Sequence, residues 1–392
     1  MVLEESVSVL GLSVADLLGW LGITAHVDQS GKMDNPYWLT EMQRTKLSTV
    51  MRVSEQTIID ASFSFFDKPM ASSKRHWVSP DVTRQTRNNI AEALRITSST
   101  CLCPRCLAER RSPRLVWRTG WLFACIHHQV LLNETCPRCH SPFGMYRRQT
   151  RIPHLARCEN HPPKGECCEQ SLTDMSTISI ADYPRLIRSQ GRLEAALNGR
   201  TPRFVGQRTT PIEYLHGLSE VVEFLKFVAV GKSLGALPTK ILELFETHVQ
   251  ARHTHGQEIQ TDAELETTEP SQQSPDASNL LAAVISTTLE IADLNDPKAA
   301  EDRLMLVVET ACADHPANPQ RVFDYIRRFM QRQRYPRLSV VFKELARRVQ
   351  KKYKLYEQTD SVFSNHSSDR ILGMGDGMLT GDRNSVLKIF NR

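Results

Sequence analysis

An array of cysteines is the feature that most constrains what this chain can fold into. Nine of its ten cysteines lie between Cys101 and Cys168. Cys103-Pro-Arg-Cys106 is followed after 18 residues by Cys125-Ile-His-His128, and Cys136-Pro-Arg-Cys139 is followed after 18 residues by Cys158-Glu-Asn-His161. The same spacing thus occurs twice at an offset of 33 residues, which predicts two metal-binding ribbons in tandem.

The coordination chemistry of zinc explains this pattern. A structural zinc ion takes four nitrogen or sulfur ligands in a tetrahedron, and four protein ligands leave no open position for catalysis. Each C-x2-C pair places two thiolates on one turn, and the second pair arrives from a strand that folds back, for which residues 121–125 have the apolar character. We expect two structural zinc ions that contribute folding free energy. The predicted ligands are Cys103, Cys106, Cys125 and His128 in the first site, and Cys136, Cys139, Cys158 and His161 in the second.

Two ligand positions have alternatives. His127 is adjacent to His128 and offers a second imidazole, although the spacing favours His128. In the second site His161 satisfies the repeat, but Cys167 or Cys168 offers a thiolate a few residues later. The spacing therefore leaves the fourth ligand of the second site open.

The N-terminus bears on the redox state of these cysteines. Glu4, Glu5 and Asp16 interrupt its apolar residues and no basic residue precedes them, which argues against a secretory signal. Clustered cysteines without such a signal are typical of metal ligands rather than disulfides. No stretch approaches the roughly 18–20 apolar residues of a membrane span, so we expect a cytoplasmic protein without a membrane partner.

The formal net charge of +5 hides an uneven distribution. Residues 74–151 hold 14 Lys/Arg against four acids, and residues 321–354 hold 12 against two, so each block carries a net charge of +10. Residues 256–279 contain six acids and no Lys or Arg. Because this acidic stretch lacks the apolar residues to order itself, it is predicted to be a linker.

The segments on either side of the cysteines have helical patterns. Leu39, Met42, Leu47, Val50 and Met51 recur at helical spacing, and Ser54 is a good N-cap for a second helix after a three-residue turn. This pair is a candidate helix-turn-helix, although plain structural helices explain it equally well. Glu55, Gln56 and Asp60 on the second helix argue against base reading there, since carboxylates repel DNA phosphates.

The second half of the chain is also predicted to be helical. Thr210-Pro-Ile-Glu213 is a capping box that opens one helix, and Pro238 opens the next. Further apolar periods begin near Val322 and Leu338. The fold class is therefore mainly α-helical and multidomain, with a central tandem zinc-ribbon module. The predicted domains are 1–70 (helical, with the helix-turn-helix candidate), 71–100 (basic connector), 101–172 (tandem zinc fingers), 173–255 (helical), 256–279 (acidic linker) and 280–392 (basic and helical, with a flexible tail).

We found no enzyme motif in the sequence: no H-E-x-x-H, no G-x-S-x-G, no Walker loop and no dinucleotide fingerprint. The zinc-finger region is instead rich in arginine with interleaved aromatic residues, which suits contact with nucleic acid. The alternative is that some arginines offset thiolate charge and that Trp117 and Trp121 pack on the ribbons. The candidate contacts with nucleic acid or a partner are Arg52, Arg105, Arg110, Arg111, Arg114, Arg147, Arg148 and Arg151.

These motifs resemble the zinc-finger core of the TniQ family of bacterial transposition proteins. The resemblance rests on Cys103-Pro-Arg-Cys106-Leu107, Trp117-Arg-Thr-Gly-Trp121, Cys125-Ile-His-His128, Leu131-Leu132 and Cys136-Pro-Arg-Cys139. The helix pair from Thr45 to Phe63 is similar to the helix-turn-helix that precedes the fingers in that family. This chain departs from the family in a short N-terminus before the first helix and in the irregular last ligand pair.

The resemblance implies a non-enzymatic role in the selection of transposition target sites. Family members link a target-recognition element to an AAA+ ATPase that recruits the transposase. Some bind a DNA attachment site, and others dock, in some systems as a homodimer, on an RNA-guided nucleoprotein complex. A bacterial, nucleoid-associated location is implied. The alternatives are a zinc-dependent, sequence-specific DNA-binding regulator and a protein-interaction scaffold.

Overall fold

The computed structural model describes residues 39, 41–60, 62–66, 90–96, 100–110, 114–143, 156–158, 160, 168–200, 203–255, 277–314, 319–332 and 336–355. The chain divides into two compact units, Met1–Val349 and Gln350–Arg392, and of the second only the end of helix α15 and the two residues after it are described. The predicted acidic linker, except for its last three residues, and the predicted tail lie outside the described residues, and the domain boundaries stay a prediction.

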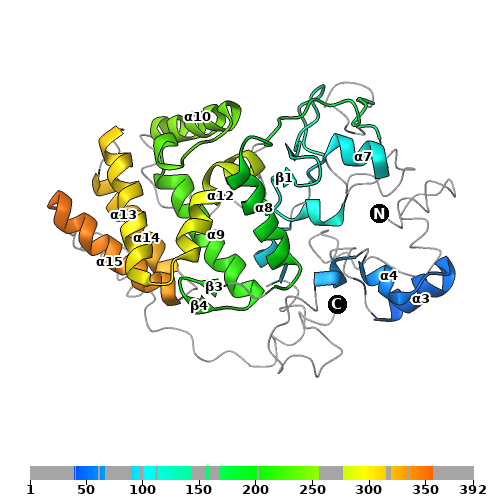
Figure 1. Cartoon of the computed structure of the whole chain (residues 1–392), viewed down its shortest axis with the longest axis horizontal. Helices are drawn as coiled ribbons and strands as arrows, with labels where there is room; N and C mark the ends of the chain where they lie inside the picture. Colours follow the sequence, from blue (N-terminus) through cyan, green and yellow to red (C-terminus); the bar gives the residue numbers. More distant parts are fainter. Residues whose placement is uncertain are drawn as a thin grey trace, which may run out of the picture. The chain divides into compact units, whose positions relative to one another are not determined.

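The prediction of a mainly helical fold with small β elements is confirmed (Figure 1). None of the described helices is long and apolar enough to span a bilayer. In chain order the elements are α3 (Glu41–Met51), α4 (Glu55–Asp60), η1 (Phe63–Phe66), α7 (Pro104–Arg110), η2 (Leu115–Arg118), β1 (Ala124–Cys125), β2 (Val130–Leu131), α8 (Pro184–Leu197), β3 (Arg203–Phe204), β4 (Gln207–Arg208), α9 (Pro211–Val228), η3 (Gly231–Ser233), α10 (Thr239–His255), α12 (Ala277–Asp293), α13 (Pro297–Asp314), α14 (Pro319–Arg332) and α15 (Pro336–Tyr353).

Helix α12 forms the centre of the helical core. It contacts α8, α9, α10 and α13 (Figure 1). Its segment from Leu281 to Ile285 is buried without interruption, so this part of the helix shows no polar face of the kind that marks an amphipathic helix. A segment that is apolar all round belongs inside a bundle, and that is where this part of α12 lies.

Helix α9 begins as the sequence predicts. Thr210 accepts a hydrogen bond from the Glu213 backbone N–H at 3.2 Å, and Glu213 accepts one from the Thr210 N–H at 2.8 Å. The apolar residues predicted for this helix are buried: Leu215, Leu218, Val222, Leu225 and Val228. The capping box therefore fixes the start of a helix whose inner face packs on α12 and α8.

A hairpin of two short strands precedes α9. Strands β3 and β4 pair antiparallel, with Arg203 opposite Arg208 and Phe204 opposite Gln207. Val205 and Gly206 form the turn with φ values of 46° and 76°, both in the left-handed region that a two-residue type I′ turn requires. Phe204 and Val205 are fully buried, so the hairpin is seated on the helical core.

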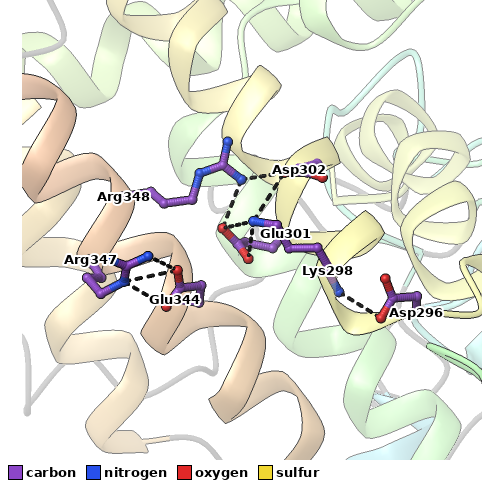
Figure 2. Close-up of polar contacts among 7 residues, drawn as sticks. All are labelled: Asp296, Lys298, Glu301, Asp302, Glu344, Arg347 and Arg348. Carbon is purple, nitrogen blue, oxygen red and sulfur yellow. Dashed lines mark hydrogen bonds and ion pairs between the residues drawn. The ribbon is translucent and has the colours of Figure 1, made fainter.

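Carboxylates on α13 connect that helix to α15. Glu301, with a side chain only 3% exposed, accepts hydrogen bonds from Lys298 Nζ at 3.0 Å and from Arg348 Nη1 at 2.8 Å (Figure 2). Arg348 also contacts Asp302. A buried carboxylate needs such partners because an unpaired charge is costly to desolvate. The network therefore holds α15 against α13, because separating the two helices would leave the buried Glu301 carboxylate without its Arg348 partner.

The N-terminal helix pair has the predicted turn. Ser54 accepts a hydrogen bond from the Thr57 N–H at 3.1 Å, which makes it the predicted N-cap of α4. Leu47 and Ile58 are buried. Met42 and Val50, which belong to the predicted apolar pattern of α3, are 66% and 45% exposed, so the buried face of α3 is narrower than the periodicity suggests. A DNA-reading role for this pair stays a prediction.

Candidate metal centres

The structure brings Cys103, Cys106, Cys125 and His128 together, with their ligand atoms all within 4.8 Å of one another. Cys103 and Cys106 lie at the start of α7, and Cys125 ends β1, which pairs with β2 through Cys125 opposite Val130. His128 sits in the turn between these two strands. The short β-hairpin thus delivers the second ligand pair to the first, as the sequence predicts.

The separations of the ligand atoms fit a tetrahedral ion. Four ligands at zinc–sulfur and zinc–nitrogen distances should lie about 3.6–3.8 Å apart. His128 Nδ1 is 3.5 Å from Cys103 Sγ, 3.3 Å from Cys106 Sγ and 3.7 Å from Cys125 Sγ, and the Cys106 and Cys125 sulfurs are 3.6 Å apart. These gaps are far longer than the roughly 2.05 Å of a disulfide, so the group suits a metal and not a bridge.

Glu109 lies beside this group and contacts its histidine. Its Oε1 accepts a hydrogen bond from His128 Nε2 at 2.8 Å, so in the neutral imidazole the unprotonated nitrogen is Nδ1, which faces the sulfurs. A carboxylate on the far nitrogen of a ligating histidine is a common way to fix its tautomer and orientation. His127, the alternative ligand, is 64% exposed and lies 3.8 Å from Glu109, outside the cysteine group.

The thiols of the first group are electrostatically coupled. A hydrogen bond from Cys103 lowers the pKa of Cys125 to about 4, and the same interaction, together with burial, raises the pKa of Cys103. Burial alone would lower the pKa of His128, but its hydrogen bonds with Glu109 and Cys125 raise it. A cation bound among these side chains would favour the thiolate forms of the sulfurs.

The second group consists of Cys136, Cys139, Cys158 and Cys168, again with ligand atoms within 4.8 Å of one another. Cys136 Sγ lies 3.6 Å from Cys168 Sγ, and Cys139 Sγ lies 3.8 Å from Cys158 Sγ. These distances match the tetrahedral spacing of four thiolates, about 3.8 Å. Burial acts to raise the pKa of Cys139, but the Ser141 N–H and the neighbouring thiols lower it to about 7.

Cys168 occupies the position for which the repeat favours His161. His161 and Cys167 lie outside the described residues. Backbone pairing explains the placement of Cys168: the Cys158 N–H donates to the Gln170 carbonyl at 2.8 Å and the Leu172 N–H donates to the Ala156 carbonyl at 2.8 Å. These bonds pair residues 156–158 with residues 170–172, which brings Cys168 back beside Cys158. Of the two open alternatives to His161, the structure brings Cys168 into the group.

Three ligands are followed by a residue in the left-handed region. Gln129 follows His128, His140 follows Cys139 and Glu169 follows Cys168, with φ values of 51°, 54° and 52°. Non-glycine residues adopt this conformation at a cost of about 1–3 kcal/mol and are held there by their surroundings. Both groups therefore contain sharp backbone turns directly after ligand residues.

The Trp117-Arg-Thr-Gly-Trp121 motif packs against residues 90–95 of the chain. Both tryptophans are buried, and Trp121 Nε1 donates to the Ala93 carbonyl at 2.7 Å. A Cβ on Gly120 would lie 2.8 Å from Arg95 Cβ, so the motif requires glycine for close approach. The packing alternative for these aromatic residues is therefore correct, and they are not available for base stacking.

Gln190 connects the first group to the helical core, a role that no sequence signal indicates. Its side chain on α8 is fully buried, and its Oε1 accepts hydrogen bonds from the backbone N–H groups of Phe123 at 3.0 Å and Ala124 at 3.1 Å. Because Ala124 precedes the ligand Cys125, the amide of Gln190 positions the strand that carries this ligand. Arg95 adds a second connection, through its ion pair with Glu223 on α9 at 3.1 Å.

The predicted nucleic-acid contacts are only partly described. Arg52 and Arg105 are exposed, and Arg114 is half-buried. Arg110 ends α7, while Arg111, Arg147, Arg148 and Arg151 lie outside the described residues. Contact of these arginines with nucleic acid stays a prediction.

Two groups of four side chains, each able to hold a metal ion, lie in the cysteine-rich module of a mainly helical protein. Residues 7–132 match the family model TniQ, which confirms the resemblance over this segment. The match includes the helix pair α3–α4 and the whole first metal group, and it indicates a protein associated with transposition. No curated protein and no solved structure matches the chain.

Proposed function

We propose that this chain is a non-enzymatic transposition adaptor that links recognition of a target site to recruitment of the transposition machinery. The observation that carries the proposal is the TniQ match over residues 7–132. This segment spans the helix pair and the first candidate metal group.

We infer that both metal groups bind zinc and that both ions are structural. The donor sets are three thiolates with one imidazole in the first group and four thiolates in the second, and zinc prefers both. Each set fills all four tetrahedral positions, and a closed site offers no position for a water nucleophile or a substrate. The role of the metal is then to stabilise the module, which is too small to build a large apolar core of its own.

The partners follow from charge and family. The block of residues 74–151 has a net charge of +10, which suits DNA or a nucleoprotein complex, including an RNA-guided one, that presents phosphates. The transposition ATPase of the AAA+ class is the proposed downstream partner, and a homodimer is the proposed assembly. Cytoplasmic action at the nucleoid agrees with these partners.

A transposition assay tests the proposal. Cells that carry a donor element with its transposase and ATPase should insert the element at its target when this chain is present and lose targeted insertion when it is absent. The variant Cys103→Ser should behave like the absence, because it opens the first metal group. Exposed Lys240→Gln is the control and should retain insertion. Targeted insertion at the wild-type frequency without the chain would refute the adaptor role.

A further inference from the structure

The β3–β4 hairpin places two arginines face to face. Arg203 and Arg208 are cross-strand partners, and both are exposed. Opposite residues in an antiparallel pair have Cα atoms about 4.5–5.5 Å apart, and like charges at that distance destabilise the pair. Arg200, three residues before the first of them, is also exposed. The hairpin thus brings positive charges together in an arrangement that lowers the stability of the strand pair.

The hairpin backbone is fixed to the core, so its two strands cannot separate to relieve this repulsion. The Val205 N–H donates to the Ala292 carbonyl at the end of α12 at 2.7 Å. A Cβ on Gly206 would lie 2.0 Å from the Asn295 carbonyl oxygen, which shows how closely the turn contacts that segment. Phe204 is buried against Tyr214, with ring centroids 6.0 Å apart. The backbone that carries Arg203 and Arg208 is therefore held closely against the helical core.

The two arginines have no counter-charge within the part of the chain that the structure describes, where the side chains of Arg203 and Arg208 form no ion pair. Other arginines on the helical core do have one: Arg185 contacts Glu290 and Arg192 contacts Asp293. In the C-terminal basic block, Arg347 and Arg348 are likewise bound to carboxylates of α15 and α13 (Figure 2).

We propose that this arginine hairpin, Arg203 with Arg208, binds the phosphodiester backbone of nucleic acid. Guanidinium groups donate pairs of parallel hydrogen bonds to phosphate oxygens, and two of them side by side can hold one phosphate or two neighbouring ones. The phosphate charge would replace the missing counter-charge. That the polyanion is nucleic acid rests on the proposed function.

The surface around the hairpin favours nucleic acid over an acidic protein. A protein interface needs an apolar or aromatic centre. Among the described residues, the exposed large hydrophobic side chains are Met42, Val50, Phe227, Leu306 and Val340, and none of them belongs to the hairpin. Gln207, which precedes Arg208 in β4, is polar and exposed. Charge without an apolar centre is typical of phosphate contacts, which position a protein without reading sequence.

The test compares two charge-matched double variants of the full chain. Arg203→Gln with Arg208→Gln removes the hairpin charges, while Arg188→Gln with Lys240→Gln removes two charges from α8 and α10. Binding to a labelled duplex and to a labelled single strand is measured at several salt concentrations, from about 50 to about 200 mM. The slope of log affinity against log salt should flatten by about 1.8 on the duplex in the hairpin variant, for two phosphates, and by less in the control.

A third variant and a stability measurement separate contact from folding. Arg203→Lys with Arg208→Lys should keep most of the slope but lose part of the affinity, since lysine lacks the paired donors. The glutamine variant should melt slightly above the wild type, because the repulsion across the strands is gone. A folding defect would lower Tm instead and would not change the salt slope selectively.

Three outcomes would overturn the inference. They are an equal loss in the hairpin and control variants, no binding of wild type to either nucleic acid at about 50 mM salt, and binding of a poly-glutamate peptide with the same dependence on the hairpin. None of these measurements involves transposition. Failure of the hairpin therefore leaves the adaptor role untouched, and failure of the adaptor role leaves the hairpin result standing.

Discussion

Glu109 should control how tightly the first metal group holds its ion. The variant Glu109→Ala removes the acceptor that lies 2.8 Å from His128 Nε2. Without it, the imidazole can rotate or protonate at Nδ1, the atom that faces the three sulfurs. Zinc affinity should therefore fall at the first group and remain unchanged at the second.

The structure narrows the size of this effect. Loss of a partner on a ligating histidine typically costs roughly 10- to 100-fold in metal affinity. The Glu109 side chain is 50% exposed, so water replaces part of the lost hydrogen bond, and we expect the lower end, about tenfold or about 1.4 kcal/mol. Because structural zinc contributes roughly 10–16 kcal/mol in small modules, the variant should still fold with metal present.

A chelator titration with a colorimetric zinc indicator measures this change. Wild type and Glu109→Ala, both loaded with two ions, are titrated with a chelator, and one ion of the variant should leave at about one-tenth of the wild-type chelator activity. Glu109→Gln keeps an oxygen acceptor and should lie between them. His127→Ala tests whether the neighbouring imidazole matters and should resemble wild type. Release of both ions from Glu109→Ala at the wild-type chelator concentration would contradict the reasoning.

Three further predictions address the second group, the core contact and the pH dependence. Cys168→Ser should reduce bound zinc from two ions to one, while His161→Ala should leave both; metal analysis of the purified variants decides between these ligands. Gln190→Ala should lower the free energy of unfolding by about 2–5 kcal/mol, since it leaves two buried N–H groups without an acceptor and opens a cavity; urea denaturation measures it, and a loss below about 1 kcal/mol would contradict the assigned role. Burial raises the pKa of Tyr214 to about 12, so the folded state favours the neutral phenol. The stability that the phenol contributes is complete below about pH 10 and is lost as the pH rises toward 12. The difference in unfolding free energy between wild type and Tyr214→Phe should therefore shrink by up to about 3 kcal/mol over that range, and a constant difference would contradict this prediction.

The local signals in the sequence predict most of the fold. The capping box at Thr210 and the apolar period from Leu338 to Val349 describe single helices whose geometry is set within a few residues, and both are found where predicted. The same reasoning does not define α12, because its segment from Leu281 to Ile285 is buried on every side and has no polar face to reveal a helical period. Its position depends on contacts with residues far away in the sequence, such as that of Ser286 with Ser189, 97 positions earlier.

The candidate site shows the same division. The C-x2-C pairs and the C-x2-H pair with His128 are local turns, and the structure brings these residues together. The last ligand of the second group is not local, because Cys168 reaches its position through backbone pairing between residues 156–158 and 170–172. A repeat of spacing carries no information about that pairing. Gln190 was missed because a single glutamine in a helix has no pattern that marks it as buried.

The contact between Gln190 and β1 has a consequence for the order in which the protein matures on the ribosome. All four candidate ligands of the first group are present once His128 has been synthesised, but the acceptor for the Ala124 N–H is Gln190, 66 residues after Ala124 and therefore 62 after His128. At roughly 5–20 residues per second, this delay lasts about 3–12 s. During that time the buried strand around Phe123 is without the helix that covers it, so the proposed zinc ion, if captured early, would stabilise the nascent module until α8 emerges.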